Sequence, residues 1–181
     1  LDLIIISKKP VIIAGGGIKN SENHEEVIKF ASHLNIPIVS SAGHADAIPF
    51  YQNLYAGQMG PRGNPIASNL VKKADLILAL GTRLGFNSTF YSYENINKKA
   101  KIIQIDADPI SLGRYFPITL GFCCDVQYLM NELNLLTQKN NQLPSCIDWT
   151  KEFLKQKEKY YKARDKKANV NSDPIQPEGL F

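Results

Sequence analysis

Short, continuous runs of apolar residues recur along the first 125 positions, and several of them end in glycine or aspartate. Five such runs predict strands, at residues 9–15, 36–41, 75–81, 100–108 and 118–125. Strands that are apolar throughout, without alternation, are buried on both faces, as in a parallel sheet covered by helices. The pattern therefore predicts a buried parallel sheet.

Between these runs, apolar residues fall three and four positions apart, which is the spacing of an amphipathic helix. Helices are predicted at residues 21–34, 64–74 and 126–136, the first with Ser21 as its N-cap. Alternating strands and helices predict an α/β fold, an open doubly wound parallel sheet of Rossmann-like topology with helices on both faces. We expect this domain to cover residues 1–137.

The C-terminal part, residues 138–181, has a different composition. A polar stretch over residues 137–145 predicts a linker, and residues 146–168 predict a helix with Trp149 and Phe153 on one face and lysines on the other. The last thirteen residues contain Pro174 and Pro177 and predict an extended connector.

Composition narrows the class of protein. The chain has 181 residues, of which 44% are hydrophobic and 21% charged, as is ordinary for a soluble globular protein. No apolar run reaches the roughly 18 residues of a membrane span, so we expect no membrane association. The chain lacks a secretory leader and an initiator Met, which favours a piece of a longer protein.

Cysteines and charge restrict the partners further. Cys123, Cys124 and Cys146 are odd in number and lack zinc-ligand spacing, so we interpret them as packing residues in a reducing cytoplasm. The net charge is +4, and residues 139–168 hold nine Lys and Arg against four Asp and Glu. The basic excess belongs to this predicted helix, which argues against a nucleic-acid partner for the domain.

Candidate chemistry lies where the predicted strands end, because ligands of open α/β sheets bind outside the carboxyl ends of the strands. The first strand ends in three consecutive glycines, and a long loop after the second carries "GQMGPRG". The third ends in "GTRLGF", the fourth in "DADP" and the fifth at an aspartate. Glycines let a pyrophosphate approach the backbone, arginine binds phosphate, and carboxylates accept hydrogen bonds from ribose. The sequence therefore predicts a dinucleotide site in outline.

The glycine motif alone is weak, and simpler interpretations stay open. "GGGIKN" has Asn20 where the usual dinucleotide motif has its last glycine, and no acid follows about 20 residues later. The glycines alone also fit a tight strand-to-helix turn. Arg62 and Arg83 fit surface ion pairs, Asp106 and Asp108 fit helix caps, and His44 fits a loop residue that hydrogen-bonds locally better than a catalytic one.

Six motifs in order carry a family resemblance: "KKPVIIAGGG", "IPIVSSAGHADAIP", "GQMGPRGN", "KKADLILALGTRL", "AKIIQIDADPISLGR" and "DV". Together they resemble the central domain of thiamine-diphosphate-dependent enzymes of the acetolactate synthase (acetohydroxyacid synthase) large-subunit family, over residues 1–137. Within that family, "GHADAIP" and "ALGTRLGFNSTF" are closer to the sulfoacetaldehyde acetyltransferase branch. The closing "PIQPEGLF" resembles the stretch that leads into the C-terminal diphosphate-binding domain of such enzymes.

The resemblance implies a three-domain subunit that decarboxylates a 2-oxo acid and transfers the resulting group. It places the catalytic glutamate in an N-terminal domain and the metal-binding Gly-Asp-Gly motif in a C-terminal domain. We therefore expect no catalytic and no metal-binding residue in this stretch, which should be inactive alone. Thiamine diphosphate and Mg²⁺ would bind through the other two domains, in a cytoplasmic homodimer or homotetramer.

The resemblance also implies an accessory nucleotide site, which holds FAD in acetolactate synthases and ADP in oxalyl-CoA decarboxylase and is empty in some members. FAD-binding members have an acid followed by Arg-Val after the third strand, whereas "GTRLGFNSTF" has no acid there, which favours the adenosine diphosphate half of the site over a whole FAD. The matching positions are Gly15, Gly16, Gly17, Gly57, Gln58, Met59, Gly60, Arg62, Gly81, Thr82, Arg83, Leu84, Asp106, Ala107, Asp108, Asp125 and Val126.

Other functions remain as alternatives. The domain could be purely structural, with an empty nucleotide site, or belong to another thiamine enzyme such as oxalyl-CoA decarboxylase. At the level of fold it also resembles sirtuin and transhydrogenase NAD(P) domains, but a sirtuin needs paired zinc-binding cysteines that this sequence lacks. Binding of nucleic acid by the basic C-terminal helix is the weakest alternative, because solvated lysines on an amphipathic helix explain that segment.

Overall fold

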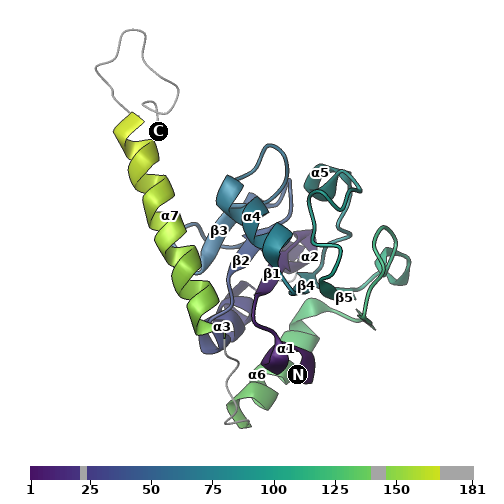
Figure 1. Ribbon diagram of the computed structural model, residues 1–181. Helices are drawn as coiled ribbons and strands as arrows, with labels where there is room; N and C mark the ends of the chain where they lie inside the picture. Colours follow the sequence, from purple (N-terminus) through teal and green to yellow (C-terminus); the bar gives the residue numbers. More distant parts are fainter. Residues whose placement is uncertain (21–23, 140–145, 168–181) are drawn as a thin grey trace.

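A computed structural model describes residues 1–20, 24–139 and 146–167. Six parallel strands form one sheet in the order β3-β2-β1-β4-β5-β6, which confirms the predicted open α/β fold (Figure 1). The strands are β1 (Pro10–Ala14), β2 (Ile38–Ser40), β3 (Tyr55–Gln58), β4 (Leu76–Leu80), β5 (Lys101–Asp106) and β6 (Leu120–Cys123). The order reverses between β1 and β4, because the chain leaves β1 toward one edge of the sheet and β4 toward the other.

Strand β3 corrects the sequence analysis, which treated this region as part of a long loop. The strand is only four residues long and lies at the edge of the sheet, where Tyr55 and Ala56 are buried but Gly57 and Gln58 are partly exposed. It pairs with β2 through an irregular register. A short, half-buried edge strand that contains glycine lacks the apolar run from which the other strands were predicted.

Seven α-helices and two 3-10 turns, η1 and η2, connect the strands in the described part of the chain. The predicted helices are confirmed as α3, α4, α6 and α7, whereas the short helices α1, α2 and α5 were not expected. Helix α6 continues three residues beyond the predicted end, and the proposed N-cap Ser21 lies outside the described residues. The bounds are α1 (Asp2–Ile6), α2 (Gly16–Asn20), α3 (His24–Leu34), α4 (Pro65–Lys73), α5 (Phe86–Thr89), α6 (Val126–Lys139), α7 (Ile147–Lys167), η1 (Ala45–Ala47) and η2 (Pro109–Ser111).

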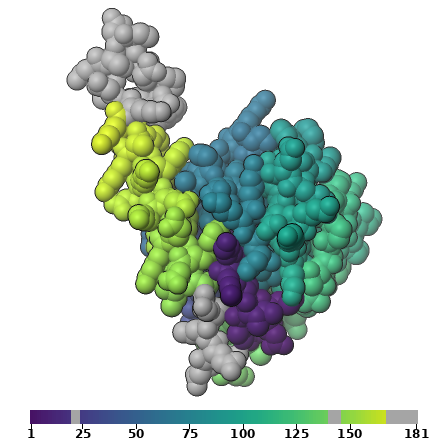
Figure 2. All heavy atoms as spheres, in the orientation of Figure 1, coloured from purple at the N-terminus to yellow at the C-terminus, as the bar shows by residue number. Residues whose placement is uncertain are grey.

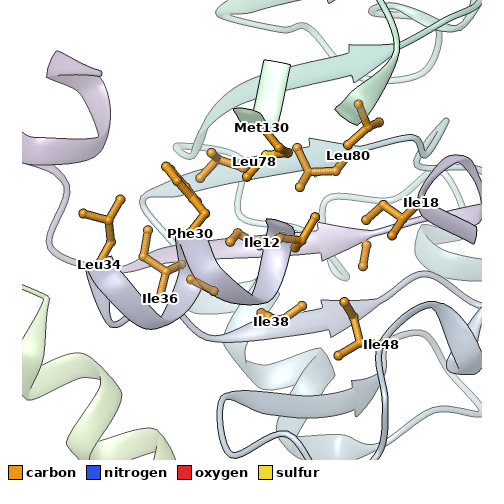
Figure 3. Packing of buried hydrophobic residues seen from close by; sticks show 14 of the residues in the cluster. Ile12, Ile18, Phe30, Leu34, Ile36, Ile38, Ile48, Leu78, Leu80 and Met130 are labelled. Carbon is orange, nitrogen blue, oxygen red and sulfur yellow. The ribbon is translucent and has the colours of Figure 1, made fainter. Parts of the chain in front are cut away.

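Both faces of the sheet are covered at its centre, where the side chains of β1 and β4 point alternately to opposite sides and are buried. The edge strand β6 is exposed along its whole length, so the prediction of a buried strand there is wrong. In β1, Ile12 packs in the core beneath α3 and α6, whereas Ile13 packs on the opposite side beneath α4 and α7. Figure 3 shows the first core, in which Phe30 of α3 and Met130 of α6 lie over Ile12 and the neighbouring strand. These two cores hold the strand ends in place, and the strand ends carry the candidate site.

The basic helix α7 is packed against the domain. Phe153 is 1% exposed, and the indole Nε1–H of Trp149 donates to the carbonyl oxygen of Pro10 at 3.0 Å. Lys157 donates to the carbonyl oxygen of Asn53 at 2.9 Å, and burial lowers the pKa of this lysine. Figure 2 shows α7 lying along one flank of the domain, beside the segment that contains α4. The predicted amphipathic helix is confirmed.

Within the described ranges, no helix combines the length and apolarity needed to cross a bilayer.

Candidate functional site

A cavity of about 530 Å³ opens at the carboxyl ends of the strands, where the sheet order reverses between β1 and β4. In open α/β sheets this crevice is the usual place for a ligand. Its lining comes from the ends of β1, β2, β4, β5 and β6 and from α5: Gly16, Gly17, Ser41, Ala42, His44, Gly81, Thr82, Arg83, Gly85, Phe86, Asn87, Ser88, Asp106, Ala107, Asp108, Asp125 and Val126.

Gly15 and Gly17, after β1, pack against the turn after β4, and Gly16 and Gly17 line the cavity. The amide of Gly15 donates to the carbonyl oxygen of Leu80 at 2.9 Å, and that of Gly17 donates to the carbonyl oxygen of Gly81 at 3.1 Å. A Cβ atom on Gly15 would lie 2.5 Å from the Cβ of Thr82, and one on Gly17 would lie 2.7 Å from the Cα of Gly81. The two turns therefore touch backbone to backbone, which leaves no room for a side chain on either residue.

This contact changes the interpretation of the triple glycine. Gly81 has a positive φ of 56°, but none of the three glycines after β1 does, so torsional freedom is not what they supply. A Cβ on Gly16 would lie 2.7 Å from the Cε1 atom of His44, so the space left by this glycine is occupied by the imidazole ring. Gly16 and Gly17 still line the cavity, so the approach of a pyrophosphate to this turn stays a prediction.

Arg83 enters the cavity from the turn after β4. Two residues hold it there: Ser111 of η2, and Asp108, which is the N-cap of η2. The Nε–H of Arg83 donates to the hydroxyl oxygen of Ser111 at 3.0 Å, and a guanidinium nitrogen lies 3.6 Å from a carboxylate oxygen of Asp108. The other Asp108 oxygen caps η2 by accepting from the amide of Ile110 at 3.0 Å. The ion pair and the helix cap considered as alternatives are thus both present, and both side chains still line the cavity.

Two further carboxylates lie beside Asp108 on the same side of the cavity. One oxygen of Asp106 accepts from the amide of Asp108 at 3.0 Å, and one oxygen of Asp125 accepts from the amide of Gln127 at 2.7 Å, which caps α6. These backbone contacts fix the orientation of each carboxylate. The ends of β5 and β6 therefore present a group of anionic acceptors, suited to hydroxyl or amine donors.

Gln104, in the middle of β5, was missed by the sequence analysis because it lies inside an apolar run. Its side chain is 2% exposed, and its Nε2 donates at 3.0 Å to the carbonyl oxygens of both Thr82 and Ser111. Its Oε1 accepts from the amide of Gly113 at 2.8 Å. One buried amide thus joins the turn after β4 to the loop after β5 and positions the two segments that carry Arg83 and Asp108.

A second cavity of about 450 Å³ adjoins the first, since both are lined by Ala42, Phe86 and Asn87. It also includes Gln58 at the end of β3, and Met59 and Arg62 from the loop that follows. The ring of Phe86 is 53% exposed, which leaves an apolar surface between the two spaces. Together the cavities form a continuous crevice from the end of β6 to the loop after β3.

The segment after β4 that forms this border has an unusual backbone. Leu84, Phe90 and Tyr91 have positive φ values of 52°, 51° and 54°, a conformation that costs energy for residues other than glycine. The buried hydroxyl of Thr89 holds the segment by donating to the carbonyl oxygen of Leu84 at 2.9 Å. A hydrogen bond with Tyr115 raises the pKa of Tyr91.

Most of the residues predicted for the site lie around this crevice. The first cavity contains Gly16, Gly17, Gly81, Thr82, Arg83, Asp106, Ala107, Asp108, Asp125 and Val126, and the second contains Gln58, Met59 and Arg62. Four predicted residues line neither: Gly15 lies under the turn, Leu84 is buried, and Gly57 and Gly60 shape the loop after β3 with φ values of 97° and 106°.

Residues that directly follow β2 were missed, although the rule about strand ends applies to them as well. Ser41 and Ala42 line the first cavity, as do Phe86, Asn87 and Ser88 from α5. His44, which the sequence analysis considered as a local loop residue, lines it as well. Across residues 1–20, 24–139 and 146–167, no group of three or more His, Cys, Asp or Glu side chains is placed to hold a metal ion.

A parallel sheet of this order with a crevice at its reversal point defines a Rossmann-like α/β domain. Comparison with family models gives the family: the model described as "Thiamine pyrophosphate enzyme, central domain" matches residues 1–133, and the chain belongs to this family. The resemblance inferred from the sequence motifs is confirmed.

Sulfoacetaldehyde acetyltransferases and acetolactate synthases are among the similar proteins. The chain is 39% identical over 134 residues to a sulfoacetaldehyde acetyltransferase of Castellaniella defragrans, covering 73% of this chain and 22% of that protein. It is 29% identical over 172 residues to an acetolactate synthase large subunit of Haemophilus influenzae, covering 94% of this chain and 30% of that protein. A large subunit from Buchnera aphidicola is 28% identical over 184 residues, or 31% of its length. The chain thus spans less than a third of each of these relatives.

Proposed function

We propose that this chain is the central domain of an acetolactate synthase-like, thiamine-diphosphate-dependent transferase or lyase, and that its cavity binds the adenosine diphosphate part of an accessory nucleotide. The family match and the names of the relatives support the first statement. In the whole enzyme, thiamine diphosphate would supply the electron-accepting chemistry for decarboxylation of a 2-oxo acid. Under this proposal the chain's own part is to hold the nucleotide and to join the N-terminal and C-terminal catalytic domains of a homodimer or homotetramer.

The distribution of charge in the cavity is the observation that carries the nucleotide proposal. Carboxylates of Asp106, Asp108 and Asp125 gather at the ends of β5 and β6, where they would accept hydrogen bonds from ribose hydroxyls or an adenine amine. Arg83, from the turn after β4, would meet the phosphates. A volume of about 530 Å³ lies within the usual range of small-molecule sites, about 300–1,000 Å³.

The adjoining cavity raises a second candidate, a ligand as long as FAD. Its 450 Å³ and the exposed ring of Phe86 offer room and a stacking surface for a further ring system. The absence of an acid after β4, where FAD-binding members have one, argues against FAD.

The three cysteines are free, which fits the reducing cytoplasm expected for such an enzyme.

We expect the chain to bind ADP and Arg83→Ala to weaken this binding by roughly 10–100-fold, the effect of losing a hydrogen bond to a charged group. The melting temperature should change little, because the ion pair with Asp108 is exposed to solvent. Calorimetric titration with ADP and FAD, beside thermal unfolding, measures both effects. Lys72→Ala, at an exposed position of α4, is the matched control and should bind like the wild type.

Two outcomes of this titration would count against the nucleotide site. If the wild type binds neither ADP nor FAD, the domain is a structural module with an empty site. If Arg83→Ala binds ADP as tightly as the wild type, the phosphates do not lie against the turn after β4. Binding of ADP but not of FAD would restrict the ligand to the first cavity.

We also expect this chain alone to be catalytically silent. The resemblance places the catalytic glutamate and the metal-binding motif in the two other domains, so thiamine diphosphate and Mg²⁺ should find no site here. With both added, the chain should release no CO₂ from pyruvate above the rate of thiamine diphosphate and Mg²⁺ without protein. An acetolactate synthase assayed in parallel shows that the assay works, and detectable decarboxylation by this chain would refute the assignment.

A further inference from the structure

The loop from Ser41 to His44, between β2 and η1, is fixed from three sides of the crevice. Its backbone amides bond to the end of β1, to α5 and to the end of β3, so the position of His44 does not depend on a bound ligand. The three bonds run from Ser41 N–H to the Ala14 carbonyl oxygen at 2.9 Å, from Ala42 N–H to Ser88 Oγ at 2.9 Å and from Gly43 N–H to Gln58 Oε1 at 3.1 Å.

The imidazole ring of His44 lies against the turn after β1 and lines the first cavity. A Cβ on Gly16 would lie 3.1 Å from each of its ring nitrogens, which shows how closely the ring approaches the backbone of that turn. Within the described part of the chain, neither ring nitrogen of His44 takes part in a side-chain hydrogen bond. Both nitrogens are therefore available to a ligand in the cavity.

The charged groups around the His44 ring determine how much its protonation would change the net charge of the cavity. Asp46, two residues along, is paired with Lys19 of α2 at 2.5 Å, and this hydrogen bond lowers the pKa of Asp46. Of the residues that line the cavity, only Arg83 and His44 can carry positive charge. Facing them from the ends of β5 and β6 are the carboxylates of Asp106, Asp108 and Asp125. Arg83 is already shared with Asp108, so a proton on His44 supplies the additional positive charge of the site.

We propose that His44 is a second cationic contact for the diphosphate and makes nucleotide binding dependent on pH. This inference rests on the proposed nucleotide site. Histidine side chains ordinarily gain their charge between pH 8 and pH 5. A protonated imidazole attracts the diphosphate and a neutral one does not, so affinity should rise as the pH falls through this range and be lost as it rises.

The test uses adenosine diphosphate ribose, whose diphosphate is esterified at both ends, so that each phosphate keeps one strongly acidic hydroxyl and a constant charge. ADP would confuse the result, since a terminal phosphate has its own second pKa near 6. A range from pH 5.5 to pH 8.0 keeps most carboxylates ionised. We expect the wild type to bind about tenfold more tightly at pH 5.5 than at pH 8.0, the order of one partly screened charge interaction.

Two variants separate charge from structure. His44→Gln should bind equally at both pH values, with the affinity of the wild type at pH 8.0, whereas His44→Arg should bind equally at both with the affinity of the wild type at pH 5.5. His33→Gln, which changes an exposed histidine on α3 outside the cavity, is the control and should keep the wild-type pH dependence. Thermal unfolding of each variant shows whether it still folds. If one His44 variant does not fold, the other still tests whether the charge of residue 44 controls binding.

The outcomes distinguish this inference from the proposed function. Binding by the wild type with no change between pH 5.5 and pH 8.0, or a pH dependence that survives in both His44 variants, would overturn the role of His44 and leave the nucleotide site intact. Equal loss of affinity at both pH values in His44→Gln and His44→Arg would assign a structural role to the ring and also overturn it. Absence of binding at either pH in the wild type would overturn the nucleotide site and this inference together.

Discussion

Gly15→Ala should lower the free energy of unfolding by about 3 kcal/mol or more, the upper range for overpacked sites, because the added atom has nowhere to go. Its Cβ would lie 2.5 Å from the Cβ of Thr82 and 2.7 Å from the carbonyl carbon of Gly81. These neighbours belong to the backbone or are fixed to it, so no change of rotamer relieves the clash. The turns after β1 and β4 would have to separate and give up the bond from Gly15 to Leu80.

Urea unfolding measures this effect, and Gly85→Ala is its matched control. Gly85 lies four residues after Gly81 and lines the same cavity, but a Cβ there would meet nothing within 4 Å and its φ is −72°. We expect this control to stay within about 0.5 kcal/mol of the wild type. Equal urea midpoints for Gly15→Ala and the wild type would show that the two turns do not pack as described.

Gln104→Met should destabilise the domain by about 2–4 kcal/mol, because it keeps the bulk of the side chain but leaves buried backbone groups without partners. The carbonyl oxygens of Thr82 and Ser111 and the amide of Gly113 would each lose the bond that Gln104 now makes. Since Thr82 adjoins Arg83, the variant should also weaken ADP binding. Urea unfolding and calorimetric titration measure the two effects.

Gln138→Met is the control for this substitution, because Gln138 is exposed in the last turn of α6 and lies outside the cavity. Its stability and its ADP affinity should match those of the wild type. If Gln104→Met were as stable as the wild type, the buried amide would not be what joins the loops after β4 and β5. If it lost stability but kept full ADP affinity, the positions of those loops would not control the site.

The sheet could be predicted from the sequence because its buried strands are apolar along their whole length. β1, β4 and most of β5 are enclosed on both faces, so burial leaves a continuous mark in the sequence. The location of the site followed from the same pattern, because parallel strands place their carboxyl ends at one edge of the sheet. Residues at or just beyond the strand ends, such as Arg83, Asp106 and Asp125, could therefore be assigned to one crevice before their geometry was known.

What the glycines and the polar residues do there was decided by the tertiary structure. The sequence shows three adjacent glycines but not their neighbours, since Gly81 and His44 are distant along the chain and reach the turn only through the order of the strands. Gln104 was hidden for the same reason, because the partners of its amide lie on loops that only the folded sheet brings together. The buried face of a strand or helix repeats at a regular spacing along the chain, so it can be recognised as a pattern of apolar residues in the sequence. Contacts between turns depend on which strands become neighbours, and only the complete fold determines that.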